Sequence, residues 1–136
     1  MIQRIQTLWL VLAVGAAFAS IKLPFYSGSL VVNNAYLKLT AAGNIPILIL
    51  TILSILLSLI TIFSYKNRGR QTGLTVLNIF VAIGIVVLYF LQLKDFGTGA
   101  FSLAAIVVFA LPVFLILALM GIRRDVKTIK SLDRLR

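Results

Sequence analysis

The sequence predicts an all-α integral membrane protein in which four transmembrane helices form an antiparallel bundle. Of its 136 residues 61% are apolar, and the mean hydropathy is +1.11, whereas soluble domains are roughly 45–50% apolar. The apolar residues gather in four segments, each close to the ~20 residues that a helix needs to cross a bilayer. So short a chain could not bury this much apolar surface in water. We therefore expect residues 1–136 to form one membrane domain.

The helices and their connections follow from the apolar segments. Two polar, glycine-containing stretches, KNRGRQTG (66–73) and LKDFGTGA (93–100), predict tight turns between antiparallel helices. The helices themselves are expected at about residues 5–23, 45–65, 74–93 and 101–122.

Residues 24–44 form the longest predicted connection, an outer loop. Within it, Ser29–Val32 and Ala35–Thr40 have the composition of short strands and flank Asn33-Asn34. Asn tolerates the positive φ of tight hairpin turns. The loop is therefore a candidate β-hairpin.

The first apolar segment also has the features of a signal peptide. Arg4 precedes an apolar run from Leu8 to Val14, and Ala17-Phe18-Ala19 has the small residues of a cleavage site. Cleavage is the alternative interpretation. We expect the segment to be retained as an uncleaved anchor helix, whose small residues let a neighbouring helix approach closely.

The basic residues predict how the helices are oriented. With the N-terminus in the cytoplasm, ten Lys and Arg residues lie on the cytoplasmic side. Only three, Lys22, Lys38 and Lys94, lie outside. Because short cytoplasmic loops are enriched in Lys and Arg, we expect a multi-pass protein with both termini in the cytoplasm.

The residue types that are missing restrict the chemistry. The chain contains no Cys, His or Glu, and its only carboxylates are Asp95, Asp125 and Asp133, all outside the apolar segments. Thiol and imidazole catalysis and the usual ligand sets for zinc, haem and iron–sulfur clusters are thereby excluded. We predict no enzymatic activity, no metal site and no cofactor.

A stripe of polar residues lies within the second and third apolar segments. Thr51, Ser54, Ser58 and Thr61 recur every three or four residues, which places them on one helix face. Asn78 is the most polar residue inside any apolar segment, so it should face the bundle interior and bond a hydroxyl or carbonyl group. We call these five residues the polar stripe. Helix packing is the favoured interpretation, because no charged residue accompanies them as transport sites usually require.

Pro112 lies midway along the fourth apolar segment. Proline cannot donate its backbone hydrogen bond, and its ring clashes with the carbonyl one turn earlier. We expect a structural kink. Broken helices also form substrate sites in transporters, but those folds usually contain inverted repeats, and this sequence shows none.

The tail, residues 123–136, is predicted to be a basic amphipathic helix. Its interpretations are a topology signal, binding to anionic headgroups, binding to RNA phosphates, and docking on a partner protein. Asp125 and Asp133 flank its apolar side, which argues against pure lipid binding. A protein partner or the chain's own segment 66–70 could supply cations for them. The basic side holds Arg123, Arg124, Lys127, Lys130 and Arg134, and the apolar side Ile122, Val126, Ile129 and Leu132.

Both ends of the chain resemble a known family. The opening MIQRIQTLWL and the closing RRDVKTIKSLDRLR are similar to the Bacteroidota membrane-protein family known as domain of unknown function 4293. The resemblance covers essentially the whole chain, and the two ends are its specific part. It implies a Gram-negative inner-membrane location and assigns no catalytic or binding residue. It also implies that Arg4 and the ending Asp133-Arg134-Leu135-Arg136 matter beyond topology.

We therefore expect a small non-enzymatic protein of the bacterial inner membrane that acts as an interaction or accessory subunit of a larger membrane complex. Its partners would be membrane lipids and other integral membrane proteins, and not DNA. The expected contact surface is the basic cytoplasmic face, which comprises Arg4, Lys66, Arg68, Arg70, Arg123, Arg124, Lys127, Lys130, Asp133, Arg134 and Arg136.

Two other functions stay open at this point. A small transporter or lipid-handling protein would use the polar stripe and the Pro112 kink, and it needs a cavity beside Ser54, Ser58 and Asn78. A tether for the ribosome or another RNA-bearing machine would use the tail, and its association would weaken steeply with salt. The tail lacks the aromatic residues that stack on RNA bases.

Overall fold

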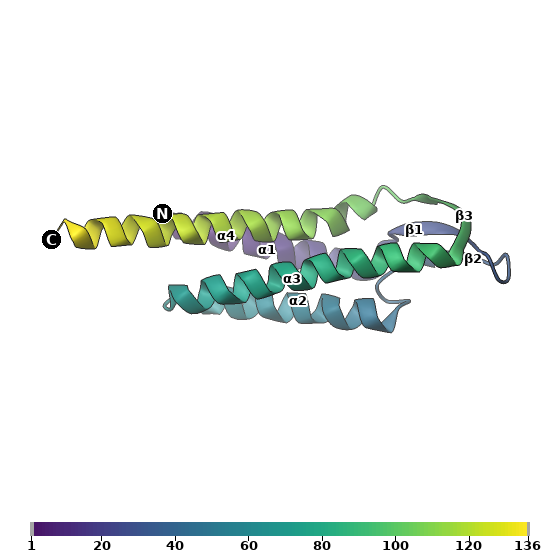
Figure 1. Ribbon diagram of the computed structural model, residues 1–136, viewed down its shortest axis with the longest axis horizontal. Coiled ribbons are helices and arrows are strands. Elements are labelled where there is room, and N and C mark those ends of the chain that lie inside the picture. The colour runs from purple at the N-terminus through teal and green to yellow at the C-terminus, as the bar shows by residue number, and fades with distance from the viewer. Residues whose placement is uncertain (1, 136) are drawn as a thin grey trace.

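The computed structural model describes residues 2–135, with side chains from residue 5 onward. Its main elements are four long helices and a small three-stranded sheet (Figure 1). The helices are long and apolar enough to cross a membrane, as the sequence predicts. They are α1 (Ile2–Lys22), α2 (Ile45–Phe63), α3 (Arg68–Gln92) and α4 (Ala105–Arg134).

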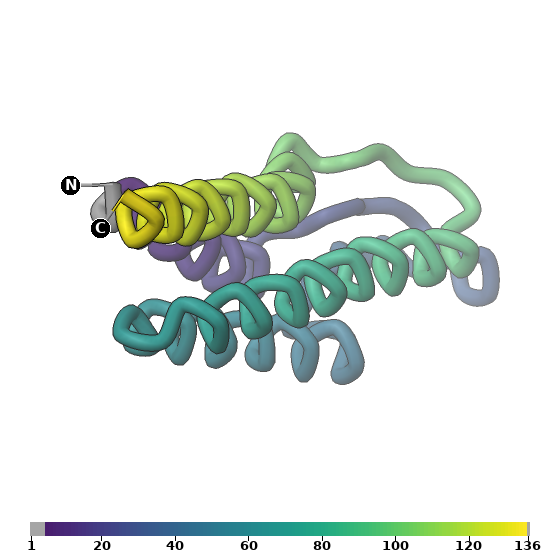
Figure 2. Tube along the Cα trace, turned by 60° about the vertical axis from the view of Figure 1, so that its left-hand side comes forward, coloured from purple at the N-terminus to yellow at the C-terminus, as the bar shows by residue number. Residues whose placement is uncertain are grey.

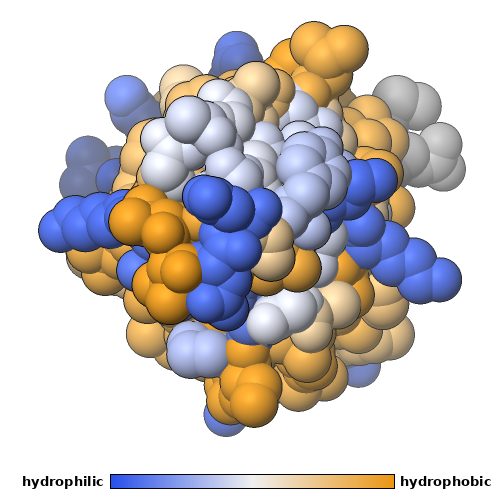
Figure 3. Space-filling model, turned by 90° about the vertical axis from the view of Figure 1, so that its right-hand side faces the viewer, coloured by the Kyte–Doolittle hydropathy of each residue, from blue (hydrophilic) through white to orange (hydrophobic). Residues whose placement is uncertain are grey.

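The helices pack as two pairs. α1 lies along α4 and α2 lies along α3, and contacts between the pairs close the bundle (Figure 2). The chain ends and the turn between α2 and α3 lie at one end of the bundle, which we call the terminal end (Figure 1). The three strands lie at the opposite end, the sheet end. Figure 3 views that end, where hydrophilic and hydrophobic side chains are mixed.

Helix α3 begins at Arg68 rather than at residue 74, so most of the stretch predicted as a turn is helical. The Asn67 side chain accepts a hydrogen bond from the backbone N–H of Arg70 at 3.3 Å, which caps the helix. Gln71 and Thr75 then lie buried on the inner face of α3. The basic residues of this stretch masked its helical periodicity in the sequence.

Helix α4 begins later than predicted, and at its other end it includes the predicted tail helix. It begins at Ala105, and it continues without a break through Pro112 into the tail as far as Arg134. The last membrane span and the predicted tail helix are therefore one helix. The polar C-terminal part of α4 extends out of the bundle along the same axis as the rest of the helix (Figure 1).

The sheet is a correction to the all-α prediction. Strand β1 (Tyr26–Leu30) lies between β2 (Tyr36–Leu39) and β3 (Phe96–Phe101), and both pairings are antiparallel. The expected hairpin exists, with Asn34 at φ 50° in its turn. However, its first strand begins at Tyr26 rather than at Ser29, and this strand ends at Leu30 rather than at Val32.

Strand β3 was predicted as a turn because of its glycines. Gly99 pairs with Gly28 of β1. A Cβ on Gly99 would lie 2.5 Å from the Ser27 carbonyl oxygen and 2.7 Å from the Gly28 Cα. Glycine therefore permits the close approach of two strands at this place, a role that composition alone does not distinguish from a turn.

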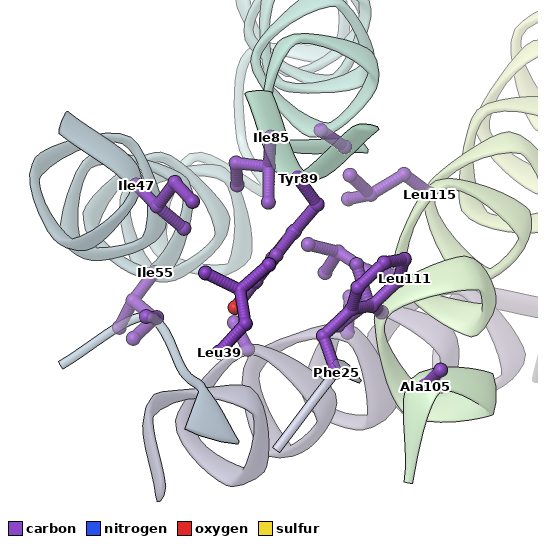
Figure 4. Packing of buried hydrophobic residues seen from close by; sticks show 14 of the residues in the cluster. Phe25, Leu39, Ile47, Ile55, Ile85, Tyr89, Ala105, Leu111 and Leu115 are labelled. Carbon is purple, nitrogen blue, oxygen red and sulfur yellow. The ribbon is translucent and has the colours of Figure 1, made fainter. Parts of the chain in front are cut away.

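The core combines aliphatic residues of the helices with one aromatic stack. Phe25 and Tyr89 are fully buried, with ring centroids 4.4 Å apart (Figure 4). Leu39 of β2 and Leu111 of α4 lie around them. These contacts attach the sheet end to helices α3 and α4.

Candidate functional site: the basic terminal end

A partly buried ion pair joins three helices at the terminal end. Asp125 of α4 is only 5% exposed, and its Oδ2 lies 3.4 Å from Nη1 of Arg68 at the start of α3. From α1, the Gln6 amide donates to the same Asp125 oxygen and to the backbone oxygen of Gly121, the latter at 2.9 Å. Because an unpaired carboxylate is costly to bury, these contacts fix where α4 leaves the bundle.

Gly121 permits this close packing between α1 and α4. A Cβ at this position would lie 2.9 Å from the Gln6 Cγ. Beside the ion pair, a cavity of about 20 Å³ is lined by Gln6, Thr7, Tyr65, Arg68 and Gln71. That volume suits a single water molecule. The cluster therefore anchors the helices and is too small to bind a metabolite.

The sequence anticipated this cluster only in part. Of the two cation sources proposed for Asp125, the chain's own segment 66–70 supplies one, through Arg68. Gln6 was not among the predicted residues, although a glutamine in an otherwise apolar helix indicates an inward-facing hydrogen bond. Asp125 is already paired within the chain, and only Asp133 of the two tail acids stays exposed.

A row of cations runs along the outer side of α4, and we call it the basic stripe. All four of its residues are exposed, and together with Val126 and Ser131 they line a hollow of about 430 Å³. Among the side chains that the structure describes, the only salt bridge is that of Arg68 and Asp125. The stripe therefore has no acidic partner there. Its members are Arg123, Lys127, Lys130 and Arg134.

The remaining predicted contact residues are distributed around this end. Lys66, Arg70 and Arg124 are exposed at the terminal end, and none of them forms a described salt bridge. The Arg4 side chain and Arg136 lie outside the described residues. Beyond Asp125, α4 projects past the ends of the other three helices (Figure 1). The terminal end is thus a stepped, strongly basic surface.

The polar stripe forms a helix contact between α2 and α3. Asn78 accepts from the Ser54 hydroxyl at 2.7 Å, and it donates to the Ser54 backbone oxygen at 3.1 Å and to the Ser58 hydroxyl at 2.7 Å. Thr51 and Thr61 bond carbonyls of their own helix. All five residues are at most 1% exposed.

No polar atom of the stripe is left unsatisfied. Among the described side chains, the only buried polar atom without a hydrogen-bond partner is the Tyr89 hydroxyl. The arrangement is that of interhelical contact in a membrane. Pro112 lies half-buried on α4, in the other helix pair.

The family model described as domain of unknown function DUF4293 matches residues 2–135. The chain belongs to this family. The match includes both terminal stretches on which the sequence resemblance depends. No curated protein and no solved structure matches the chain. Because the DUF4293 description names no activity, the roles of residues in this DUF4293 protein must be argued from its geometry.

Proposed function

We propose that this DUF4293 protein is a non-enzymatic accessory or interaction subunit of a larger complex in the bacterial inner membrane. In this proposal it contacts its partners through the terminal end, which lies in the cytoplasm together with both termini. The observation that carries the proposal is the projection of α4 past the rest of the bundle, with the basic stripe exposed and unpaired.

The charge distribution supports this orientation. The terminal end holds Lys66, Arg68, Arg70 and the basic residues of the tail, whereas the sheet end holds Lys22, Lys38 and Lys94. Short cytoplasmic segments are enriched in Lys and Arg. A topology signal needs only the charges, however, and not a regular helix with a separate basic side.

The polar stripe supports a structural role for the membrane part. Its residues bond one another or their own helix and are buried. Ion and proton pathways usually contain a charged intramembrane residue, and the stripe has none. The exposed polar surface at the terminal end is therefore the better candidate for a specific contact.

Native extraction tests the proposal. The full chain, tagged at the sheet end so that the tail stays free, is crosslinked in cells, extracted in mild detergent and sized on native gels. We expect it in an assembly much larger than the 14.9 kDa monomer. A variant with all four basic-stripe residues changed to Gln should leave that assembly, because charge-dependent contacts set partner choice.

The matched control changes Lys22, Lys38 and Lys94 to Gln at the sheet end and should stay in the assembly. Labelling of single cysteines must show that both variants keep their orientation. If the intact, crosslinked chain migrates only as a free monomer, the proposal is wrong.

A further inference from the structure

The inward side of α4 follows a regular spacing of three and four residues. This is the repeat of helices that pack side by side through one seam. Within the bundle, the seam is filled mainly by contacts with α1 and α3. Its buried members include Val108, Leu111, Leu115, Ala118, Ile122 and Asp125.

The same repeat continues beyond the bundle. Ile129 follows Asp125 by four residues and Leu132 follows by three more, yet these side chains are 39% and 59% exposed. At this point α4 projects past the other helices (Figure 1). Within the bundle, α1 and α3 cover the seam. Beyond the bundle, the seam is exposed to solvent for two further turns.

A step in the structure combines this open seam with a basic floor. Arg68 pairs with Asp125 one turn below Ile129, so the first turn of α3 lies at the foot of the open seam. Lys66, in the turn just before α3, is exposed. We call this step the ledge: its wall is Ile129 and Leu132, and its floor is Lys66 and Arg68.

We propose that the ledge binds an amphipathic helix of a partner protein, whose apolar stripe packs on Ile129 and Leu132 and whose end nearest the bundle carries acidic side chains opposite Lys66. The inference rests on the proposed function and specifies the partner's chemistry. The docked helix covers the part of the seam that lies in water beyond the bundle.

The position of the ledge argues against lipid as the occupant. The apolar part of α4 ends near Ile122, and Leu132 lies ten residues further along a helix that runs in line with the span. At ~1.5 Å per residue this is about 15 Å. The headgroup layer is only about 5–7 Å thick on each side of the hydrocarbon. Leu132 is therefore carried past the headgroups.

Charge argues against a second copy of this chain. The helical segment that projects freely is the tail, and its exposed charges are mostly Lys and Arg. Placed on the ledge of another copy, it would bring these cations against Lys66. Like charges at such a contact cost free energy, whereas acidic residues on a different protein complement the floor.

Site-specific photocrosslinking in living cells tests the ledge. A photoreactive amino acid replaces Leu132 in one full-length chain and Lys127, on the basic stripe, in another. We expect the probe at Leu132 to form an adduct with a partner protein. Peptide mass spectrometry of the adduct should map it to an amphipathic helix with acidic residues at one end.

Every other result at Leu132 overturns the inference. An adduct of twice the chain's mass identifies a second copy, and an adduct with phospholipid identifies the headgroup layer. Partner adducts at Lys127 with none at Leu132 reject the ledge but leave the proposed function standing. If neither position forms a partner adduct and the chain extracts as a monomer, both proposals fail.

Substitutions give a second measurement. Changing Ile129 and Leu132 to Gln keeps good helix formers at exposed positions and should reduce partner recovery roughly tenfold, as loss of a small apolar anchor does. The matched control changes Val31 and Val32 to Gln, two apolar residues of the sheet end that are 63% and 87% exposed, and it should change recovery by less than about twofold. Equal recovery for both variants contradicts the proposal.

Discussion

Arg68 and Asp125 form a partly buried ion pair, 3.4 Å from Nη1 to Oδ2, where α4 leaves the bundle. The Gln6 amide donates to the same carboxylate, so one acidic side chain joins α1, α3 and α4. The ion pair holds α4 at the point where it leaves the bundle, and it places Arg68 at the foot of the open seam.

Removing this carboxylate should destabilise the bundle. Asp125→Ala leaves the Arg68 guanidinium without its counter-charge and removes one of the two acceptors of the Gln6 amide, the other being the Gly121 carbonyl. Because Arg68 is 26% exposed and so retains some hydration, we expect a loss of about 2 kcal/mol in the free energy of unfolding. Reversible unfolding in detergent, followed by circular dichroism, measures it.

Asp133→Ala is the matched control, since Asp133 is exposed and unpaired among the described side chains. It should change stability by less than about 0.5 kcal/mol. Equal losses in the two variants would show that the ion pair does not stabilise the fold.

Asn78 should contribute to helix packing. Asn78→Leu removes three hydrogen bonds to Ser54 and Ser58 while keeping the same branched shape and number of side-chain heavy atoms, and we expect a loss of about 1–2 kcal/mol. Thr61→Val is the control, because that hydroxyl bonds only the Leu57 carbonyl of its own helix. Competition between folded and denatured states in mixed micelles measures both. A loss for Thr61→Val as large as for Asn78→Leu would contradict the prediction.

The helices and the turn at Asn34 could be predicted, because the length of an apolar segment and the residue types of a turn depend only on neighbouring residues. Strand β3 could not, because Gly97 and Gly99 fit a turn as well as a strand whose partner lies about 70 residues away in sequence. The start of α3 was missed for a related reason. Arg68 has the character of a loop residue in the sequence, and its partner, Asp125, lies far away along the chain.

The candidate site shows the same division. The basic side of the tail follows from helical periodicity alone, and the structure places its residues in one stripe. Which acid is buried depends on where α1 and α3 end relative to α4, and only the three-dimensional arrangement fixes that. The exposure of Ile129 and Leu132 likewise results from the unequal lengths of the helices at the terminal end.

Gly99 should be essential for the sheet. Gly99→Ala places a Cβ 2.5 Å from the Ser27 carbonyl oxygen and 2.7 Å from the Gly28 Cα, and these β1 backbone atoms cannot move aside as a flexible side chain can. We expect β3 to separate from β1 and the sheet end to become sensitive to protease. Gly97→Ala is the control, because its nearest neighbour is a Val31 methyl group at 3.3 Å that can shift. Limited proteolysis of detergent-solubilised protein should cleave only the Gly99 variant rapidly, and equal cleavage of both would contradict this explanation.

The proposed orientation can be measured directly, because the chain contains no cysteine. Ser131→Cys introduces a thiol on the exposed tail, and Asn33→Cys introduces one in the turn of the sheet end. With ten basic residues predicted inside and three outside, we expect a membrane-impermeant maleimide to label Asn33→Cys in spheroplasts with intact membranes. Ser131→Cys should react only after the membrane is opened. If Ser131→Cys is labelled before permeabilisation, the orientation is the reverse of the proposed one. Both the basic stripe and the ledge would then lie outside the cytoplasm.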